Sequence, residues 1–429
     1  MIRLNTADKD FEAKFASLQH RTGSMREIEK NVADIINRVR TGGNKALVQC
    51  AMEFDKAVIT EESIRITEAE FKEAAAKIAP DDAAAINAAL VNVQAFARKK
   101  LPENWFEPMR DGVSLGEQFR PLDRVGVYIP GGTAPLVSTV IHTAGIAAAA
   151  GVKEIVAVTP PGRNGAPIHP EVLYAMQACG VTEAYRLGGV YGVAALACGT
   201  ETIKKVEKIA GPGNAYVTCA KKLLYGEVAI DMVAGPSEIM IVADADNDPA
   251  CLAADMLSQA EHGSGLEQAV IVSTSAELLD QVEAEIIRQK AQLSRIETVD
   301  RVLEKGVFLI LASSRDEAIE LAGRYAPEHL EMCVSDPLDA ARQVTAAGAI
   351  FIGPYTPEPI GDFCAGPSHV LPTAGSAKFF AGLSVDSFFR RSSLVMYSRE
   401  AIRREGPIAA RFAAMEGLDA HGKSAMSRS

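Results

Sequence analysis

The feature that most restricts the fold of this chain is a change of hydrophobic period near Arg124. Before residue 100 the apolar residues follow helical spacing, whereas after Arg124 short apolar runs alternate with alanine-rich helical stretches. The runs VGVYI, EIVAV, EIMIVAD, QAVIVST, VFLIL, HLEMCV and GAIFIG predict buried strands. Alternating strands and helices build parallel sheets covered by helices. We therefore expect an α/β protein with two Rossmann-like domains that face each other, about 105–236 and 237–354.

Helices are predicted on both sides of these blocks. The first helix covers 24–41 and stops at Gly42-Gly43, and a T-x-x-E capping box at Thr67 and Glu70 starts a second. A third covers 82–100 and ends before Pro102. Further helices are expected at 275–291, 315–324, 337–346 and 398–427. The loop at 353–378 is rich in proline and glycine, and loops of that length usually carry function.

Charge and composition exclude several classes of protein. The net charge is −11, from 44 basic and 55 acidic residues, which disfavours nucleic-acid binding. No apolar run reaches the ~18–20 residues of a membrane span, and the first residues show no signal-peptide core, so a cytoplasmic location is expected. The 7 cysteines form no CxxC pair and are interpreted as buried structural thiols.

Several histidines lie beside acids in turn-like strings. Gln259 and His262 are three residues apart near the end of a predicted helix, so both could ligate one metal ion from one face. A capping or surface role is the alternative for such a histidine. Glu328 and His329 precede a predicted strand and could divide acid–base work, or could form a solvated loop pair.

Two further pairs are less informative by themselves. Asp362 and His369 lie in the proline- and glycine-rich loop, where Asp362 could simply form an Asx-turn. Glu416 and His421 are five residues apart, about 140° around a helix, so spacing predicts no joint role. The residues alone indicate an acidic α/β protein, with a histidine–carboxylate group typical of an enzyme.

Taken together, seven strings resemble the histidinol dehydrogenase family from about residue 25 to 425. They are GVYIPGG (126–132), KIAGPGNAYV (208–217), IDMVAGPSE (230–238), LSQAEHG (257–263), APEHLE (326–331), GDFCAGPSHVLPT (361–373) and EGLDAH (416–421). Their order and spacing along the chain match the family. The resemblance implies a zinc- and NAD-dependent enzyme that oxidises L-histidinol to L-histidine through a bound aldehyde.

The same resemblance implies roles for individual residues. Zinc would be bound by Gln259, His262, Asp362 and His421, and Glu328 and His329 would be the acid–base pair. The implied substrate contacts are Ser237, Gln259, His262, Glu328, Asp362, His369, Glu416 and His421. The implied NAD contacts are Tyr128, Tyr191 and Asn214.

The family also implies a domain plan and a homodimer whose subunits share each active site. The expected division is an N-terminal segment (1–24), a catalytic domain (25–104 with 237–376), an NAD-side domain (105–236) and a C-terminal helical segment exchanged between subunits (377–429). Glu416 and His421 would then serve the partner subunit, which removes the objection to their helical spacing.

The chain departs from the family pattern on the cofactor side. Tyr191 in GGVYGVAAL takes the place of the glutamine of the family's GGAQA, and PLVS with a following His142 replaces AYPS. Two alternatives therefore stay open. One is a paralogue that oxidises another small polar alcohol such as a sulfonated diol, and the other is a catalytically silent NAD-binding regulatory protein.

Overall fold

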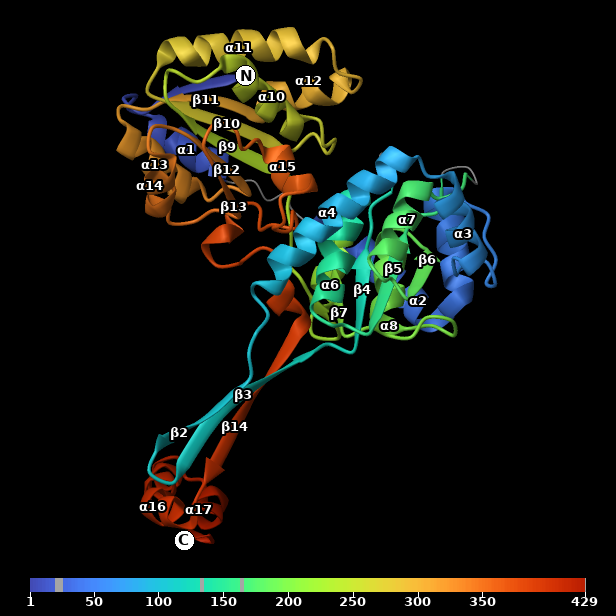
Figure 1. Ribbon diagram of the computed structural model, residues 1–429, viewed down its shortest axis with the longest axis vertical. Helices are drawn as coiled ribbons and strands as arrows, with labels where there is room; N and C mark the ends of the chain where they lie inside the picture. Colours follow the sequence, from blue (N-terminus) through green and yellow to red (C-terminus); the bar gives the residue numbers. More distant parts are fainter. Residues whose placement is uncertain (20–25, 132–134, 163–165, 429) are drawn as a thin grey trace.

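The computed structural model describes residues 1–19, 26–131, 135–162 and 166–428. The predicted start of the first helix at residue 24 and Gly132 of the GVYIPGG string lie outside these ranges. Two parallel sheets carry the chain, and a slender antiparallel arm extends away from both and holds the C-terminus (Figure 1). The predicted α/β class is confirmed.

The larger sheet has six parallel strands in the order β1-β11-β10-β9-β12-β13. Its strands are β1 (Ile2–Asn5), β9 (Glu238–Ala243), β10 (Gln268–Ser273), β11 (Val307–Leu311), β12 (His329–Cys333) and β13 (Ala349–Ile352). One face packs against α10 (Pro249–Ala260), α11 (Ala276–Lys290) and α12 (Ile296–Lys305). The other packs against α1 (Phe11–Gln19), α13 (Arg315–Tyr325) and α14 (Pro337–Gln343). Burial on both faces explains why these strands are almost continuously apolar.

The smaller parallel sheet has the order β6-β5-β4-β7-β8. Its strands are β4 (Arg124–Tyr128), β5 (Glu154–Thr159), β6 (Glu183–Arg186), β7 (Lys208–Ala210) and β8 (Ala229–Ile230). On one face lie α2 (Arg26–Cys50), α8 (Gly189–Cys198) and α9 (Ala215–Leu224). On the other lie α3 (Glu68–Lys77), α4 (Pro80–Arg98), α7 (Pro170–Ala178) and the continuous helical stretch α5 (Val137–Val140), η2 (Ile141–Gly145) and α6 (Ile146–Ala149).

The expected domain plan is wrong for residues 25–104. Helices α2, α3 and α4 share the cores of the five-stranded sheet, not of the sheet built from 237–376. A backbone bridge between Arg65 and Tyr185 joins this segment to the edge strand β6. Conversely, β1 of the N-terminal segment pairs with β11 of the larger sheet. An amphipathic helix reveals that one face is buried, but its pattern does not specify which sheet covers that face.

Local predictions in this N-terminal region agree with the structure. Thr67 and Glu70 form the complete capping box of α3. The backbone of α2 breaks at Gly43, which has φ 51 and ψ −138, so the helix ends at Gly42-Gly43 as predicted. A second helical stretch follows up to Cys50 and is continued by the turn η1 (Ala51–Asp55).

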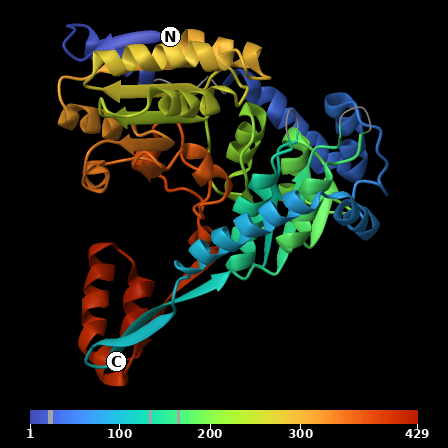
Figure 2. The same cartoon turned by 45° about the horizontal axis from the view of Figure 1, so that its top comes forward.

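The arm is built from β2 (Trp105–Arg110), β3 (Val113–Pro121) and β14 (Phe389–Tyr397), followed by α16 (Arg399–Met415) and α17 (Asp419–Met426). Both views show it leaving the two sheet domains and ending in the helix pair (Figures 1 and 2). The prediction that 377–429 is helical missed β14 and the short 3-10 turns η4 (Ser376–Lys378) and η5 (Val385–Phe388). Strand β14 could not be predicted locally, because it is stabilised by pairing with the distant β3. None of the described helices has the length and apolar character needed to cross a membrane.

Candidate active site

The acid–base pair lies at the start of β12, between β9 and β13 of the larger sheet. The left-handed residue Ala326 ends α13, and Pro327 and Glu328 then lead directly into the strand. Gly348 allows β13 to approach closely, since a Cβ there would lie 2.6 Å from the Glu328 carbonyl oxygen. The pair therefore lies at the amino end of this parallel sheet, whereas ligands of open α/β sheets usually bind at the carboxyl ends.

Glu328 is buried and its carboxylate is anchored to the neighbouring strand. Its Oε2 atom accepts a hydrogen bond of 3.0 Å from the backbone N–H of Glu238, the first residue of β9. The side chain is 8% exposed. Burial raises the pKa of Glu328 to about 8, because a charged carboxylate loses its hydration in this position.

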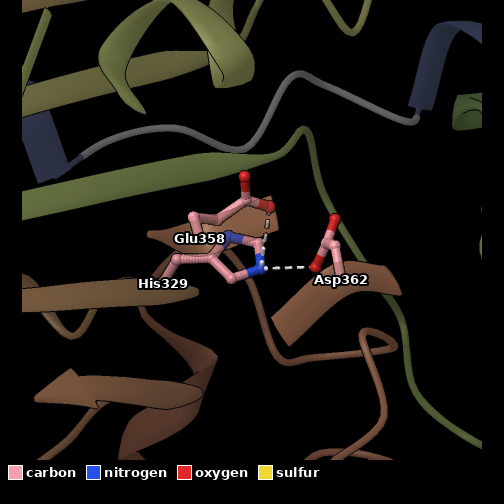
Figure 3. Close-up of side chains that lie close together, drawn as sticks. All are labelled: His329, Glu358 and Asp362. Atoms are coloured by element: carbon pink, nitrogen blue, oxygen red, sulfur yellow. Dashed lines mark hydrogen bonds and ion pairs between the residues drawn. The ribbon is translucent and has the colours of Figure 1, made fainter. Parts of the chain in front are cut away.

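His329 is held at both ring nitrogens. Its Nδ1 lies 3.2 Å from the Glu238 carbonyl oxygen, which can only accept, so Nδ1 carries a proton. Its Nε2 lies 3.2 Å from Oδ1 of Asp362 (Figure 3). Burial alone would lower the pKa of His329, but the carboxylates of Glu328 and Asp362 outweigh it and raise the pKa to about 10. In this state the imidazole is positively charged and donates from both nitrogens.

Asp362 and Glu358 come from the short helix α15 (Glu358–Phe363), which packs beside β12 and the end of α10. The Glu358 Oε1 atom lies 3.8 Å from Nε2 of His329, and Ser258 of α10 donates a 3.1 Å hydrogen bond to its Oε2. Figure 3 shows His329, Glu358 and Asp362 converging. Burial raises the pKa of Glu358 to about 8, and the charge of Asp362 adds to this effect.

These three side chains could hold a cation, since one ligand atom from each lies within 4.8 Å of the others. Sequence reasoning missed Glu358. The signal was present, because Glu358 and Asp362 are four residues apart in PEPIGD and share one face of a helix. The loop was predicted to lack secondary structure, so this spacing was not considered.

Gln259 fits the predicted metal site. Its side chain is fully buried in the last turn of α10, next to Ser258, and neither its carbonyl oxygen nor its amide nitrogen has a hydrogen-bond partner among the described residues. An unpaired buried amide is costly, so a ligand there would compensate for it. His262 follows α10 and is exposed, and its Nδ1 lies 3.2 Å from the backbone carbonyl oxygen of Gln259. The donor set of amide, imidazole and carboxylate is one that zinc accepts.

His369 and Ser237 lie around this group. His369 Nδ1 is 3.0 Å from the Asp362 carbonyl oxygen, and Nε2 is 3.3 Å from the Thr139 hydroxyl of the other domain. Ser237 is partly exposed immediately before Glu238, and its carbonyl oxygen accepts from Gln268. After Asp362 the chain crosses between domains, because Val370 already belongs to the core of the five-stranded sheet.

Glu416 and His421 do not reach this group within one chain. Both are exposed at the tip of the arm, Glu416 at the end of α16 and His421 in α17. The arm tip lies away from the sheet that carries His329 (Figures 1 and 2). A role in the active site therefore requires a second copy of the chain, which stays a prediction.

The residues expected to contact NAD surround the smaller sheet. Tyr128 ends β4, and its hydroxyl accepts a 3.1 Å hydrogen bond from the backbone of Gly189 at the start of α8. Tyr191 is 1% exposed and its hydroxyl donates to Asp55. Asn214 is exposed and caps α9 through hydrogen bonds from Tyr216 and Val217. Each side chain thus has a local structural role, and cofactor contact stays a prediction.

A buried candidate acid–base pair next to a possible cation site, in a chain built on two α/β domains with parallel sheets, is typical of an α/β enzyme. The family model described as histidinol dehydrogenase matches residues 18–429. The chain is 45% identical to the histidinol dehydrogenase of Geobacter sulfurreducens over 426 residues, 98% of each chain. It is 43% identical to that of Rhizobium meliloti, over 99% of this chain and 97% of the other.

A crystal structure of histidinol dehydrogenase from Elizabethkingia anophelis has the same fold. It superposes with a TM-score of 0.94 at 33% sequence identity and covers 100% of this chain and 98% of that one. The chain therefore belongs to the histidinol dehydrogenase family, and the expected membership is confirmed.

Proposed function

We propose that this chain is a histidinol dehydrogenase of cytoplasmic histidine biosynthesis, which oxidises L-histidinol to L-histidine with two equivalents of NAD. The observation that carries the proposal is the buried pair of Glu328 and His329 beside Asp362, in a chain of this family. Two successive oxidations at one carbon need one base for the hydroxyl proton and one base for water, and the pair supplies both.

The site is proposed to bind zinc through Gln259, His262 and Asp362, with His421 of the partner subunit as the fourth ligand. The unpaired, buried amide of Gln259 supports this assignment. Bound zinc would orient the amino alcohol and polarise its oxygen. Once Asp362 serves as a ligand, its charge no longer favours the protonated form of His329, and the imidazole becomes available as a base.

In the first oxidation His329 takes the hydroxyl proton while the carbinol carbon loses its hydride to NAD. The Nδ1–H bond to the Glu238 carbonyl leaves Nε2 as the nitrogen that receives this proton. In the second oxidation Glu328 would remove a proton from a water molecule that attacks the aldehyde. The resulting hydrate would lose a hydroxyl proton to His329 and its hydride to the second equivalent of NAD, which leaves the carboxylic acid. A carboxylate whose pKa lies near 8 is a stronger base than an ordinary glutamate.

The site is proposed to be completed in a homodimer. Glu416 of the partner subunit would contact the substrate, together with His369 and Ser237 of this chain. The arm supports this proposal, because its large apolar side chains are exposed in the single chain and a partner subunit would cover them. They are Trp105, Phe106, Met109, Val395, Met396, Phe412 and Met415. NAD is proposed to bind on the side of Tyr128, Tyr191 and Asn214.

The test is to measure NAD reduction with L-histidinol and with a panel of polar alcohols that includes a sulfonated diol. Two NADH per histidinol, with activity lost on chelation and restored by zinc, are expected. Turnover of another alcohol without turnover of histidinol would refute the proposal and indicate a paralogue with a different substrate. No turnover of any substrate by metal-loaded protein would favour a silent NAD-binding protein.

A further inference from the structure

His142 belongs to the five-stranded domain, but its side chain contacts the loop of the other domain's catalytic group. It lies in η2, a single π-helical turn within the helical stretch 137–149, and such turns are frequent at functional sites. The ring is fully buried and stacks on the ring of His369, with centroids 4.6 Å apart and planes 20° apart. A second contact joins the two segments, because the Ser368 hydroxyl donates a 3.1 Å hydrogen bond to the backbone carbonyl oxygen of His142.

Core stability does not explain a histidine in this position. Neither ring nitrogen has a hydrogen-bond partner within the described part of the chain, although the carbonyl groups of Phe363 and Pro367 face the ring. Burial, followed by the charge of His369, lowers the pKa of His142 to about 3, so the ring is neutral at physiological pH. An apolar side chain would avoid the cost of two unpaired buried nitrogens. What the imidazole provides is a flat aromatic face against His369.

The contacts around His369 show why that face matters. Asp362 binds one edge of the ring through Nδ1, and Thr139 binds the other edge through Nε2. A substrate that hydrogen-bonds to Nε2 has to displace the Thr139 hydroxyl, because a neutral imidazole offers one lone pair at that atom. Stacking uses the face of the ring instead of its edge, so the His142 contact can persist when substrate is bound.

We propose that His142 is a positioning residue for substrate recognition, which fixes the ring plane of His369 in the segment that joins the two domains. The inference rests on the proposed function, in which His369 contacts the amino alcohol. His142 would thereby support substrate affinity without touching substrate, metal or NAD.

The test compares His142→Leu, which removes the flat face, with His142→Phe, which keeps it. Ile141→Val is the matched control, since Ile141 is a buried core residue of the same turn. All are measured as metal-loaded protein with L-histidinol and NAD. His142→Leu is expected to raise KM for L-histidinol about tenfold, whereas kcat and KM for NAD should change by less than about threefold. This pattern follows when a variant loses binding that the ground state and the transition state share equally. His142→Phe is expected to stay within about threefold of the wild type.

Three results would overturn the proposal. They are an unchanged KM for L-histidinol in His142→Leu, an equal rise in KM for NAD, or an equal effect of Ile141→Val, which would indicate general loosening of the turn. A folded His142→Phe that behaves like His142→Leu would also count against stacking. If Phe is too large and the protein unfolds, the comparison of His142→Leu with Ile141→Val still decides. Failure of the wild type to oxidise L-histidinol would instead refute the proposed function.

Discussion

His329 and Asp362 are 33 residues apart in the sequence, yet Nε2 of the first lies 3.2 Å from Oδ1 of the second. The contact arises because β13 pairs with β12 and the following helix α15 packs on β12, where the backbone N–H of Glu358 donates a hydrogen bond to Glu331. In the absence of a cation the pair is an imidazolium bound to a carboxylate, which holds the pKa of Asp362 well below its usual range although burial opposes this. A cation bound to Asp362 would offset part of the negative charge that keeps His329 protonated.

The first prediction concerns metal removal and the ligand set. Gln259→Ala and Asp362→Asn are expected to weaken zinc binding by at least about tenfold, because the first removes an oxygen donor and the second replaces a charged carboxylate by a weaker, neutral amide donor. Metal content after dialysis against a chelator, measured by mass spectrometry, gives the comparison. Glu358→Gln is the informative partner variant. It should keep its zinc if Glu358 only lines the site, whereas loss equal to that of Asp362→Asn would make Glu358 a ligand.

The second prediction separates the two oxidations. Glu328→Gln is nearly isosteric but cannot take a proton from water, so turnover of the aldehyde should fall by about 10²-fold or more, in the range of general-base catalysis. Oxidation of L-histidinol to the aldehyde should be reduced less, because His329 remains. Single-turnover NADH formation from each substrate measures the two steps separately. Equal losses in both would remove the assigned division of work.

The third prediction concerns acid stability of the five-stranded domain. Arg124 at the start of β4 is bound by Glu183 and Glu154, and its hydrogen bond is the main cause that holds the pKa of Glu183 at about 2 instead of 4.5. A depressed folded-state pKa adds stability above pH ~4.5, which is lost as the pH falls toward about 2. The Glu183 side chain is 21% exposed, so solvent weakens the interaction. We therefore expect it to add on the order of 2 kcal/mol to the free energy of unfolding.

Urea unfolding of Glu183→Gln measures this contribution. The variant should be destabilised by about 2 kcal/mol at pH 7, and the difference from the wild type should shrink markedly by pH 3. Glu73→Gln is the control, since Glu73 pairs with Lys77 on an exposed helix face, where ion pairs contribute little. A gap between Glu183→Gln and wild type that is the same at both pH values would show that proton linkage is not its cause.

The fourth prediction tests whether the arm of one subunit completes the site of another. His421→Ala and Glu328→Gln homodimers should each form almost no L-histidine, the product of the complete reaction, which is the activity measured in this test. When the two variants are unfolded together and refolded, random pairing gives mixed dimers in which one of two sites is intact, so about a quarter of wild-type activity should return. A mixture that remains inactive would place His421 and Glu328 of one chain in the same site.

Much of the secondary structure could be predicted, because it depends on neighbours in the sequence. The capping box of α3 needs only Thr67 and Glu70, and the break in α2 needs only a glycine that tolerates positive φ. Seven strands of the two parallel sheets were recognisable as short apolar runs, namely β4, β5, β9, β10, β11, β12 and β13, whereas β1, β6, β7 and β8 were not predicted. Strand β1 has only four residues, and β14 depends on pairing with β3, so neither carried a usable local signal.

The candidate site divides in the same way. Glu328, His329, Asp362 and Gln259 were recognisable from the motifs around them, and the structure brings the first three together around β12 and α15. Glu358 was overlooked, although its spacing from Asp362 was visible. The stacking of His142 on His369 joins two segments that are distant in the sequence, and nothing in either motif predicts it.

By itself, the sequence determined the α/β class, the helix boundaries set by capping and glycine, and the residues able to do chemistry, since these follow from hydrophobic period and side-chain type. Only the tertiary structure decided that the helices of 26–98 cover the smaller sheet, and that the acid–base pair lies at the amino end of the larger one. It also decided that His369 stacks on the distant His142. These features depend on which buried faces fit together, and many apolar faces have similar patterns but only one complementary partner.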